Sequence, residues 1–213
     1  MVTSIIDIWH SRSSERSSPT IMPDGCQDLI CKHVAGEPPH WFISPLYDMP
    51  KKVNIAAQSS MFGFRLQPGT SIDEASLLGS LMPHSLEIKE VADRIETFTS
   101  RSSQAVEILD CLSQDAMSVQ RAASNLGVHI RSLQRCIVKE TGRTATYWIR
   151  LARVRRAARA LQDNAPLLEI AYTFGFSDQS HMTREFQHWF GYPPKIVRSQ
   201  PKLLQILASN GYG

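Results

Sequence analysis

The sequence predicts an α+β protein with a small β-rich N-terminal domain, a helical linker and an all-α C-terminal domain. Short apolar runs separated by turn residues fill the first part of the chain, which is typical of strands. Apolar residues at helical spacing dominate from residue 71 onward. A helical pattern with a central glycine occurs twice in the second half, which predicts two helix-turn-helix units joined by a long helix.

The strand segments of the N-terminal part are bounded by turn signals. Apolar runs at residues 5–9, 41–43 and 61–66 are strand candidates, and residues 26–31 follow a Pro-Asp-Gly turn. This density of short strands predicts a small β-sandwich or half-barrel.

Helical spacing begins after these strands. Residues 86–98 and 105–112 each place apolar side chains on one helix face. We therefore expect three regions: a β-rich effector or dimerisation domain, a helical linker and a double helix-turn-helix domain, at residues 1–84, 85–102 and 103–213.

Charge divides the chain into two unequal halves. The net charge of the 213 residues is only +3. Residues 1–100 contain 8 basic and 12 acidic side chains, whereas residues 101–213 contain 15 and 8. A basic half joined to an acidic half indicates a module that binds a polyanion, attached to a module with another role.

The two copies of the helical pattern differ by one inserted residue. Their central glycines are Gly127 and Gly175, each preceded by an alanine four residues earlier. An arginine follows the glycine by eight residues in the first copy, at Arg135, and by nine in the second, at Arg184. Surface solubility does not require arginines at equivalent places, so this match favours DNA contact.

The first copy predicts a second helix over about residues 130–140. Leu133 and Ile137 lie at positions i and i+4 and face the core. The side chains pointing away are then Arg131, Gln134 and Arg135. Arginine pairs with guanine and glutamine with adenine in the major groove, so these three are candidate base readers.

The second copy has the same division of faces. Met182 and Phe186 take the inward positions, and Ser177 is the expected N-cap. The exposed face then carries Gln179, Ser180, His181 and Arg184.

A helix over residues 145–162 is expected to join the copies. Eighteen residues at about 1.5 Å each give a rod of roughly 27 Å. That length suits two recognition helices about one DNA turn apart, roughly 34 Å. The arginines between residues 150 and 159 either attract phosphates or form a solvated basic face.

Residues 105–198 resemble the AraC/XylS family of bacterial transcription regulators. The most specific stretch runs from residue 170 to residue 186 and continues through residues 190–195 to Arg198. The resemblance implies that one recognition helix from each copy enters successive major grooves. It also implies a set of DNA-contacting positions, with Gln179 near the backbone and the others reading bases: Arg131, Gln134 and Arg135 in the first unit, and Ser180, His181 and Arg184 in the second.

Two positions depart from the family pattern at helix starts. His129 stands where the family usually has a capping serine, and Pro166 where a serine or aspartate is usual. Proline is compatible with a helix start, so the departures concern capping alone.

Residues 1–70 resemble a short cupin-related N-terminal domain of some family members, through residues 23–30 and 63–69. The resemblance implies an effector or dimerisation role. Polar residues within apolar strands and their aromatic neighbours are candidates for a ligand pocket: Asp24, Asp28, Trp41, Phe62, Phe64 and Arg65. A buried salt bridge or turn hydrogen bonds are the alternatives for the charged residues, and core packing is the alternative for the aromatic ones.

The sequence favours neither metal binding nor a secreted location. Cys26 and Cys31 lie on opposite faces if both belong to one strand, so with His33 and His40 they make a poor ligand set. The cysteines are expected to be reduced thiols, with Cys111 and the fourth, at residue 136, on apolar helix faces. Lacking a signal peptide and a membrane span, the protein is expected in the cytoplasm.

These features favour a sequence-specific transcription regulator responsive to a small molecule. The expected partners are double-stranded DNA with an asymmetric two-part site, a small-molecule effector, a second copy of the chain and, for an activator, RNA polymerase. No nucleophile–base set, P-loop or dinucleotide motif appears, so no catalysis and no cofactor are expected. The alternatives are a DNA-repair or DNA-modifying protein targeted by an AraC-like unit, and an adaptor that does not bind DNA.

Overall fold

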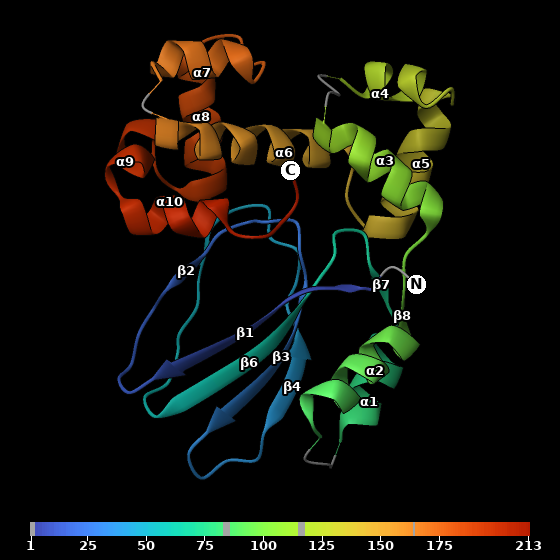
Figure 1. The fold of residues 1–213 in the computed structure, drawn as a ribbon, viewed down its shortest axis with the longest axis vertical. Helices are drawn as coiled ribbons and strands as arrows, with labels where there is room; N and C mark the ends of the chain where they lie inside the picture. The colour runs from blue at the N-terminus through green and yellow to red at the C-terminus, as the bar shows by residue number, and fades with distance from the viewer. Residues whose placement is uncertain (1–2, 83–85, 115–117, 164) are drawn as a thin grey trace.

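The N-terminal half is built on one antiparallel sheet (Figure 1). The structure is a computed structural model that describes residues 3–82, 86–114, 118–163 and 165–213. The sheet has the order β1-β6-β3-β4, and its strands are β1 (Ile5–Ser13), β3 (Asp28–Val34), β4 (His40–Ile43) and β6 (Ser59–Leu66). Two short ladders accompany it: β2 (Thr20–Ile21) with β5 (Lys51–Lys52), and β7 (Ser71–Ile72) with β8 (Thr99–Ser100).

One face of the sheet is covered by two helices, α1 (Glu74–Leu81) and α2 (Ile88–Phe98). Because side chains alternate between faces along a strand, one set of strand residues points at these helices. Leu29 and Phe64, both fully buried, pack there with Val91 and Ile95 of α2. The range expected as a linker thus contributes to the core of the sheet.

The second half is helical and holds the larger core. Its helices are α3 (Ser103–Gln114), α4 (Val119–Asn125), α5 (Ile130–Thr141), α6 (Ala145–Ala160), α7 (Leu167–Thr173), α8 (Gln179–Phe190), α9 (Pro194–Ser199) and α10 (Pro201–Ala208). Trp148, Trp189 and Phe186 are among the largest side chains in this core, and each is at most 1% exposed.

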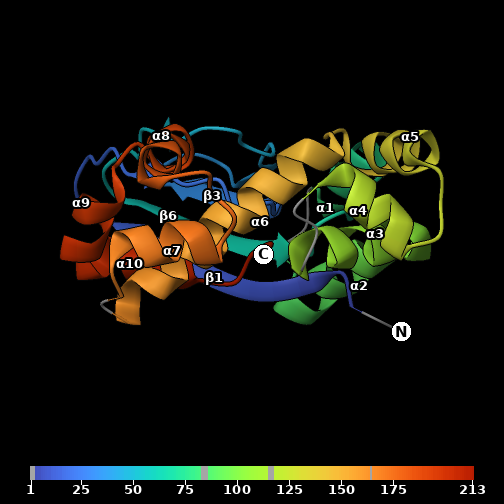
Figure 2. The same ribbon diagram turned by 90° about the horizontal axis from the view of Figure 1, so that it is seen from above.

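The long helix α6 lies between the other helices and organises them. It has 16 residues, about 24 Å of rise, and continues into the 3-10 turn Leu161–Asp163, close to the expected range. The pair α4–α5 lies at one end of α6 and the pair α7–α8 at the other (Figure 2). Buried residues occur around much of its surface, so α6 is an internal helix of the domain.

The sheet module and the helical part are in contact. Met22, which follows β2, belongs to the core of the helical part. The hydroxyl of Tyr147 on α6 donates to the carbonyl oxygen of Tyr47 at 2.9 Å, and Arg143 donates to that of Leu46. Within the ranges that the structure covers, no helix has the length and apolar character needed to cross a bilayer.

Candidate functional site

The first helix-turn-helix unit consists of α4, a turn at Gly127 and α5. Gly127 has a φ of 63°, a left-handed conformation that glycine adopts without steric cost. The following N–H, of Val128, bonds to the carbonyl oxygen of Ala123 at 3.0 Å and sets the angle of α5. The Nδ1 atom of His129 accepts from the N–H of Arg131 at 3.2 Å, so histidine replaces the usual serine as N-cap.

The predicted readers of this unit lie on the open face of α5. Leu133 and Ile137 are buried at the predicted i and i+4 positions. Arg131, Gln134 and Arg135 are exposed.

The second unit, α7 and α8, repeats this geometry with a longer turn. Gly175 has a φ of 73°, and the N–H of Phe176 bonds to the carbonyl oxygen of Ala171 at 2.9 Å, the equivalent of the bond in the first unit. Four residues separate α4 from α5 and five separate α7 from α8. The inserted residue therefore lies in the turn and leaves both helix faces intact.

The N-cap of α8 is Asp178, so the expectation of Ser177 is wrong. The Asp178 carboxylate accepts from the N–H of His181 at 2.6 Å. Asp178 is fully exposed, and its hydrogen bond from the His181 N–H, with a further one from the Ser177 hydroxyl, lowers its pKa. A carboxylate at a helix N-terminus also complements the helix dipole, which the hydroxyl of Ser177 does not.

The residues of α8 that are predicted to read DNA lie on its outer face, but the ring of His181 also contacts Phe176 and Ser177. Gln179, Ser180 and Arg184 are exposed. The His181 ring packs edge-on to Phe176 at 5.5 Å, and its Nδ1 lies 3.2 Å from the backbone nitrogen of Ser177. Contacts with Phe176 and Ser177 therefore hold the His181 ring at the start of α8.

The arginines of α6 differ in their exposure and bond to other parts of the protein. Arg155 is 1% exposed, and burial lowers its pKa to about 10. Arg156 donates to the Ser113 carbonyl oxygen at 3.2 Å, and Arg159 donates to that of Gly213. Arg155 is thus enclosed by the elements around α6, whereas Arg156 is exposed and bonds at the surface to the end of α3.

A bidentate ion pair joins α6 to α8. Arg150 donates from Nε and Nη2 to the two carboxylate oxygens of Glu185, at 2.9 and 2.8 Å. The indole of Trp189 also donates to Glu185, at 3.4 Å. A bidentate pair restricts orientation as well as distance, so it holds α8 at a defined angle to α6. Glu185 was not expected from the sequence, although it falls three residues after Met182, on the inward face of α8.

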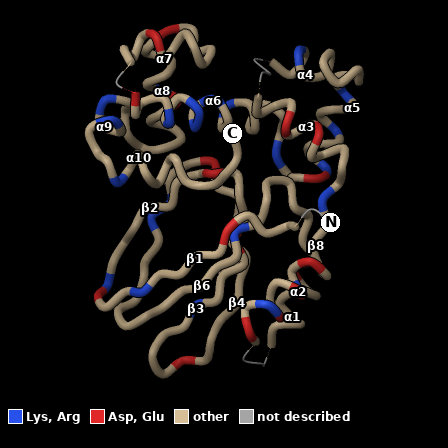
Figure 3. Tube along the Cα trace, viewed as in Figure 1, with Lys and Arg blue, Asp and Glu red and all other residues tan. Residues whose placement is uncertain are grey.

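Basic residues are more frequent in the helical part than on the sheet. Figure 3 shows Lys and Arg positions along α5, α6, α8 and α9, with fewer on the sheet. Two helix-turn-helix units with exposed arginines, in a basic domain, define the DNA-binding class of protein.

Comparison with known proteins supports that class and specifies the family. A model described as "Helix-turn-helix domain" matches residues 122–200. A relative from Escherichia coli strain K12, the "HTH-type transcriptional activator RhaS", is 23% identical over 176 residues, which are 82% of this chain. The helical part of the chain is a double helix-turn-helix domain of the AraC/XylS type, as its motifs indicate.

The similarity extends to solved structures. ToxT from Vibrio cholerae O395 covers 96% of this chain and 98% of its own length, with 9% identity and a TM-score of 0.49. The DNA-binding domain of AdpA, in complex with a target DNA, covers 46% and 92%, with 23% identity and a TM-score of 0.40. This chain spans 63% of the length of the RhaS relative.

The N-terminal sheet has a cavity of about 520 Å³ on the face opposite α1 and α2. Asp24, Asp28 and Arg65 are among the residues that line it. Arg65 bonds to Asp24 through Nη2 at 3.1 Å and to Asp28 through Nε at 3.2 Å. The indole of Trp9 donates to the same oxygen of Asp28 at 3.0 Å.

The three aromatic residues expected in this pocket lie elsewhere, and that part of the expectation is wrong. Phe64 belongs to the core between the sheet and α1 and α2, with Trp41 and Phe62 packed against it. Strand alternation separates them from Arg65 and Asp28, which point to the other face. The aromatic side chains lining the cavity are Trp9, Phe42 and Tyr47. Phe42 directly follows Trp41, so opposite parity was a signal for it.

Burial controls the ionisation of the groups around Arg65. Burial raises the pKa of Asp24, although Arg65 and the N–H of Cys26 act against that rise. Burial alone would lower the pKa of Arg65, but Asp24 and Asp28 outweigh it and raise that pKa. Burial, with Asp24 adding to it, raises the pKa of the Cys26 thiol. Cys26 is therefore a protonated thiol at neutral pH.

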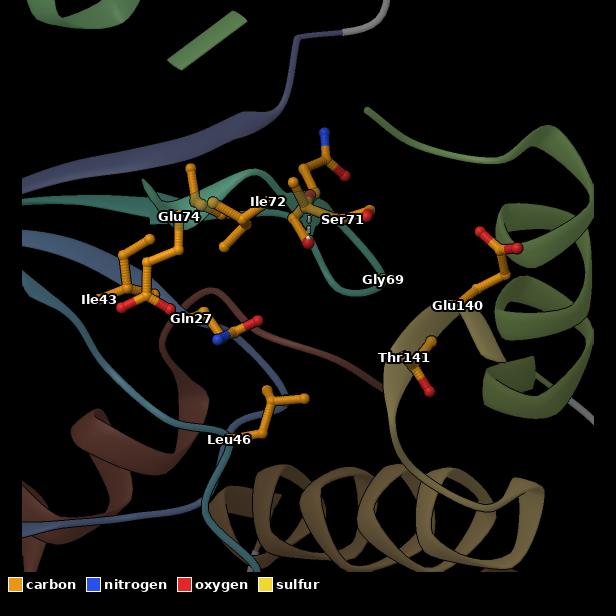
Figure 4. Close-up of a pocket in the computed structure, with 13 residues that line it drawn as sticks. Gln27, Ile43, Leu46, Gly69, Ser71, Ile72, Glu74, Glu140 and Thr141 are labelled. Atoms are coloured by element: carbon orange, nitrogen blue, oxygen red, sulfur yellow. Dashed lines mark hydrogen bonds between the residues drawn. The ribbon is translucent and has the colours of Figure 1, made fainter. Parts of the chain in front are cut away.

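A second, smaller cavity separates the sheet module from α5. Its volume is about 220 Å³. Figure 4 shows Gln27, Leu46 and Ser71 on the sheet side, with Glu140 and Thr141 at the end of α5 across from them. This cavity adjoins the first recognition helix.

Cys26, Cys31 and Cys136 are free thiols, and the Sγ of Cys111 lies 3.9 Å from the carbonyl oxygen of Ala122. Among the described residues, no three side chains of His, Cys, Asp or Glu are grouped so that they would hold a metal ion.

Proposed function

We propose that this protein is a sequence-specific, DNA-binding transcription regulator that acts in the cytoplasm and responds to a small molecule bound by its N-terminal sheet. One observation carries the proposal. Two second helices, each exposing an arginine at the matching position, are held at opposite ends of one internal helix.

The proposed DNA site has two unequal parts. The exposed set on α5 contains Arg131, Gln134 and Arg135, and the set on α8 contains Ser180, His181 and Arg184 with Gln179 at its start. Arginine and glutamine pair with guanine and adenine, whereas serine and histidine have other preferences. Different side chains at equivalent places read different base sequences, so one chain recognises an asymmetric site over two successive major grooves.

The effector is proposed to bind in the 520 Å³ cavity. That volume falls in the range of small-molecule sites, and such sites combine apolar walls with few polar groups. Trp9, Phe42 and Tyr47 supply the walls, and Arg65 with its two carboxylates supplies the polar end. Dimerisation and contact with RNA polymerase remain predictions from the family resemblance.

The DNA proposal is tested without knowing the operator. The full chain is used to select binding sequences from a pool of random duplex DNA. The affinity for each selected sequence is then measured by fluorescence anisotropy at several salt concentrations. We expect an enriched two-part sequence and a linear fall of the logarithm of affinity with the logarithm of salt. Failure to enrich any sequence, with no salt-dependent binding to duplex DNA, overturns the proposal.

A further inference from the structure

Residues 209–213 form a strap between the sheet module and the helical part. They follow α10 and run beneath α6, next to the sheet (Figure 1). The aromatic residue of this strap, Tyr212, is 5% exposed. The strap is therefore anchored in the interior through Tyr212, while Ser209 and Asn210 are exposed.

One side of the strap is bonded to residues that line the effector cavity. Arg65 donates from Nη1 to the carbonyl oxygen of Asn210 at 3.0 Å. The N–H of Tyr212 donates to the carbonyl oxygen of Asp24 at 2.8 Å. Arg65 uses its other two nitrogens on Asp24 and Asp28, so one guanidinium group joins the cavity carboxylates to the strap.

The other side of the strap is bonded to the DNA-binding domain. Arg155 on α6 donates from Nη2 to the carbonyl oxygen of Ser209 at 2.8 Å. The ring of Tyr212 packs on Trp148 of α6 with centroids 4.7 Å apart. Its hydroxyl donates to the carbonyl oxygen of Leu109 on α3 at 2.8 Å. Helix α3 packs on α4 and α5, and α6 joins both units.

Glycines make the fit too close for any added side chain. A Cβ placed on Gly211 lies 2.8 Å from Nη2 of Arg155 and 2.9 Å from the carbonyl oxygen of Asp24. A Cβ on Gly25 lies 2.7 Å from the Cβ of Tyr212. The strap is wedged between cavity wall and helix, so neither side moves without affecting it.

We propose that the strap couples the occupancy of the cavity to the arrangement of the two helix-turn-helix units. A ligand group that competes for Asp24, Asp28 or Arg65 changes the bonds that hold Asn210, and a displaced strap releases Tyr212 from Trp148. A ligand shifts such an equilibrium by its differential affinity for the two arrangements. The inference rests on the proposed function and deepens it by assigning a route of regulation.

The first test uses a matched pair of glycine variants in the full chain. Gly211→Ala inserts a methyl group between Arg155 and Asp24, whereas Gly79→Ala, in α1, meets nothing within 4 Å. Amide hydrogen exchange is followed by mass spectrometry without DNA or ligand. We expect Gly211→Ala to raise exchange in the strap, in residues 24–30 and in α6, and Gly79→Ala to leave these segments unchanged. A rise confined to residues 209–213 overturns the proposal.

The second test measures DNA binding of the same variants on the selected two-part site. Allosteric couplings commonly change affinity fivefold or more. We expect Gly211→Ala to change the affinity by at least about fivefold and Gly79→Ala to leave it unchanged. If the Gly211→Ala affinity equals that of the wild type, the strap is passive packing.

If Gly211→Ala does not fold, a variant with a smaller structural change provides the same test. Tyr212→Phe removes only the hydroxyl that bonds to Leu109. We expect this variant to raise amide hydrogen exchange in residues 24–30, which lie on the opposite side of the strap. Unchanged exchange in residues 24–30 would overturn the proposal. The exchange readout needs no DNA. If the wild-type chain binds no DNA, the proposed function is refuted, but the exchange data still show whether the strap joins residues 24–30 to α6.

Discussion

At the scale of single residues, the arginines of the helical domain fall into two groups that the sequence alone does not separate. Arg135 and Arg184 are exposed on second helices, whereas Arg155 and Arg159 donate to carbonyl oxygens of residues 209–213. The helical period predicted the first group correctly as exposed, because i and i+4 positions define a face. The bonding of the second group depends on which elements surround α6, and no local sequence pattern contains that information.

We predict that Arg184→Ala weakens binding to the selected site by about 1–3 kcal/mol, because an arginine that reads a base contributes that much. The measurement is a fluorescence anisotropy titration at fixed salt. Lys202→Ala, an exposed change on α10, is the matched control and should keep wild-type affinity. Equal affinities for all three proteins would reject the assignment of Arg184.

We predict that Phe64→Ala lowers the free energy of unfolding by about 3–5 kcal/mol, as expected for a fully buried phenylalanine. Phe64 is 0% exposed in the core of the sheet. Phe42, which lines the cavity and is half-buried, provides the comparison, and its alanine variant should lose less. Chemical denaturation measures both, and a larger loss for Phe42→Ala would contradict the placement of the two rings.

At the scale of elements, the two recognition helices are held differently. Helix α8 is joined to α6 by the bidentate Arg150–Glu185 pair. The equivalent of Glu185 in the first copy is Cys136, whose sulfur lies 3.4 Å from the side-chain oxygen of Gln104 on α3. The inserted residue and this change of partner make the units different in anchoring as well as in reading residues.

We predict that Glu185 makes the stability of the fold sensitive to acid. Burial raises the pKa of Glu185, but the Arg150 hydrogen bonds and charge outweigh that effect and lower it. A carboxylate with a lowered folded-state pKa stabilises the fold above its unfolded-state pKa. That contribution is lost as the pH falls through the folded-state value. The window therefore lies in the acid range below the ordinary pKa of glutamate.

The test compares thermal unfolding of wild type and Glu185→Gln between neutral and acid pH. At neutral pH the variant should be less stable by about 1 kcal/mol, since partial solvent exposure of Arg150 reduces the value of the pair. The difference should shrink as the pH falls through the acid window. Glu169→Gln, an exposed change on α7, should show neither effect. A difference independent of pH would reject the role of this charge.

At the scale of the whole molecule, α6 sets the separation of the two units. It is buried on several sides and held by α3, α8 and the strap, so the two recognition helices keep one separation while the strap is in place. A rigid pair of readers requires its two half-sites at one spacing and on one side of the DNA.

We predict that inserting about 5 base pairs between the half-sites, half a helical turn, reduces affinity to that of a single half-site. An insertion of about 10 base pairs restores the side of the DNA but exceeds the reach of α6, so it should not restore affinity. Electrophoretic mobility shifts on the spacer series measure this. Wild-type affinity for the half-turn insertion would show that the units read DNA independently.

The sequence by itself determined the double helix-turn-helix domain and its exposed reading faces, since periodicity, caps and turn glycines are local. It also placed Asp24, Asp28 and Arg65 together as candidates, because they interrupt apolar strands. Tertiary structure alone decided that Trp41, Phe62 and Phe64 face α1 and α2, since a strand pattern does not say which face is covered. It also decided that Arg155 of α6 is buried and that residues 209–213 join cavity to helices. Contacts between residues far apart in the chain leave no periodic signal.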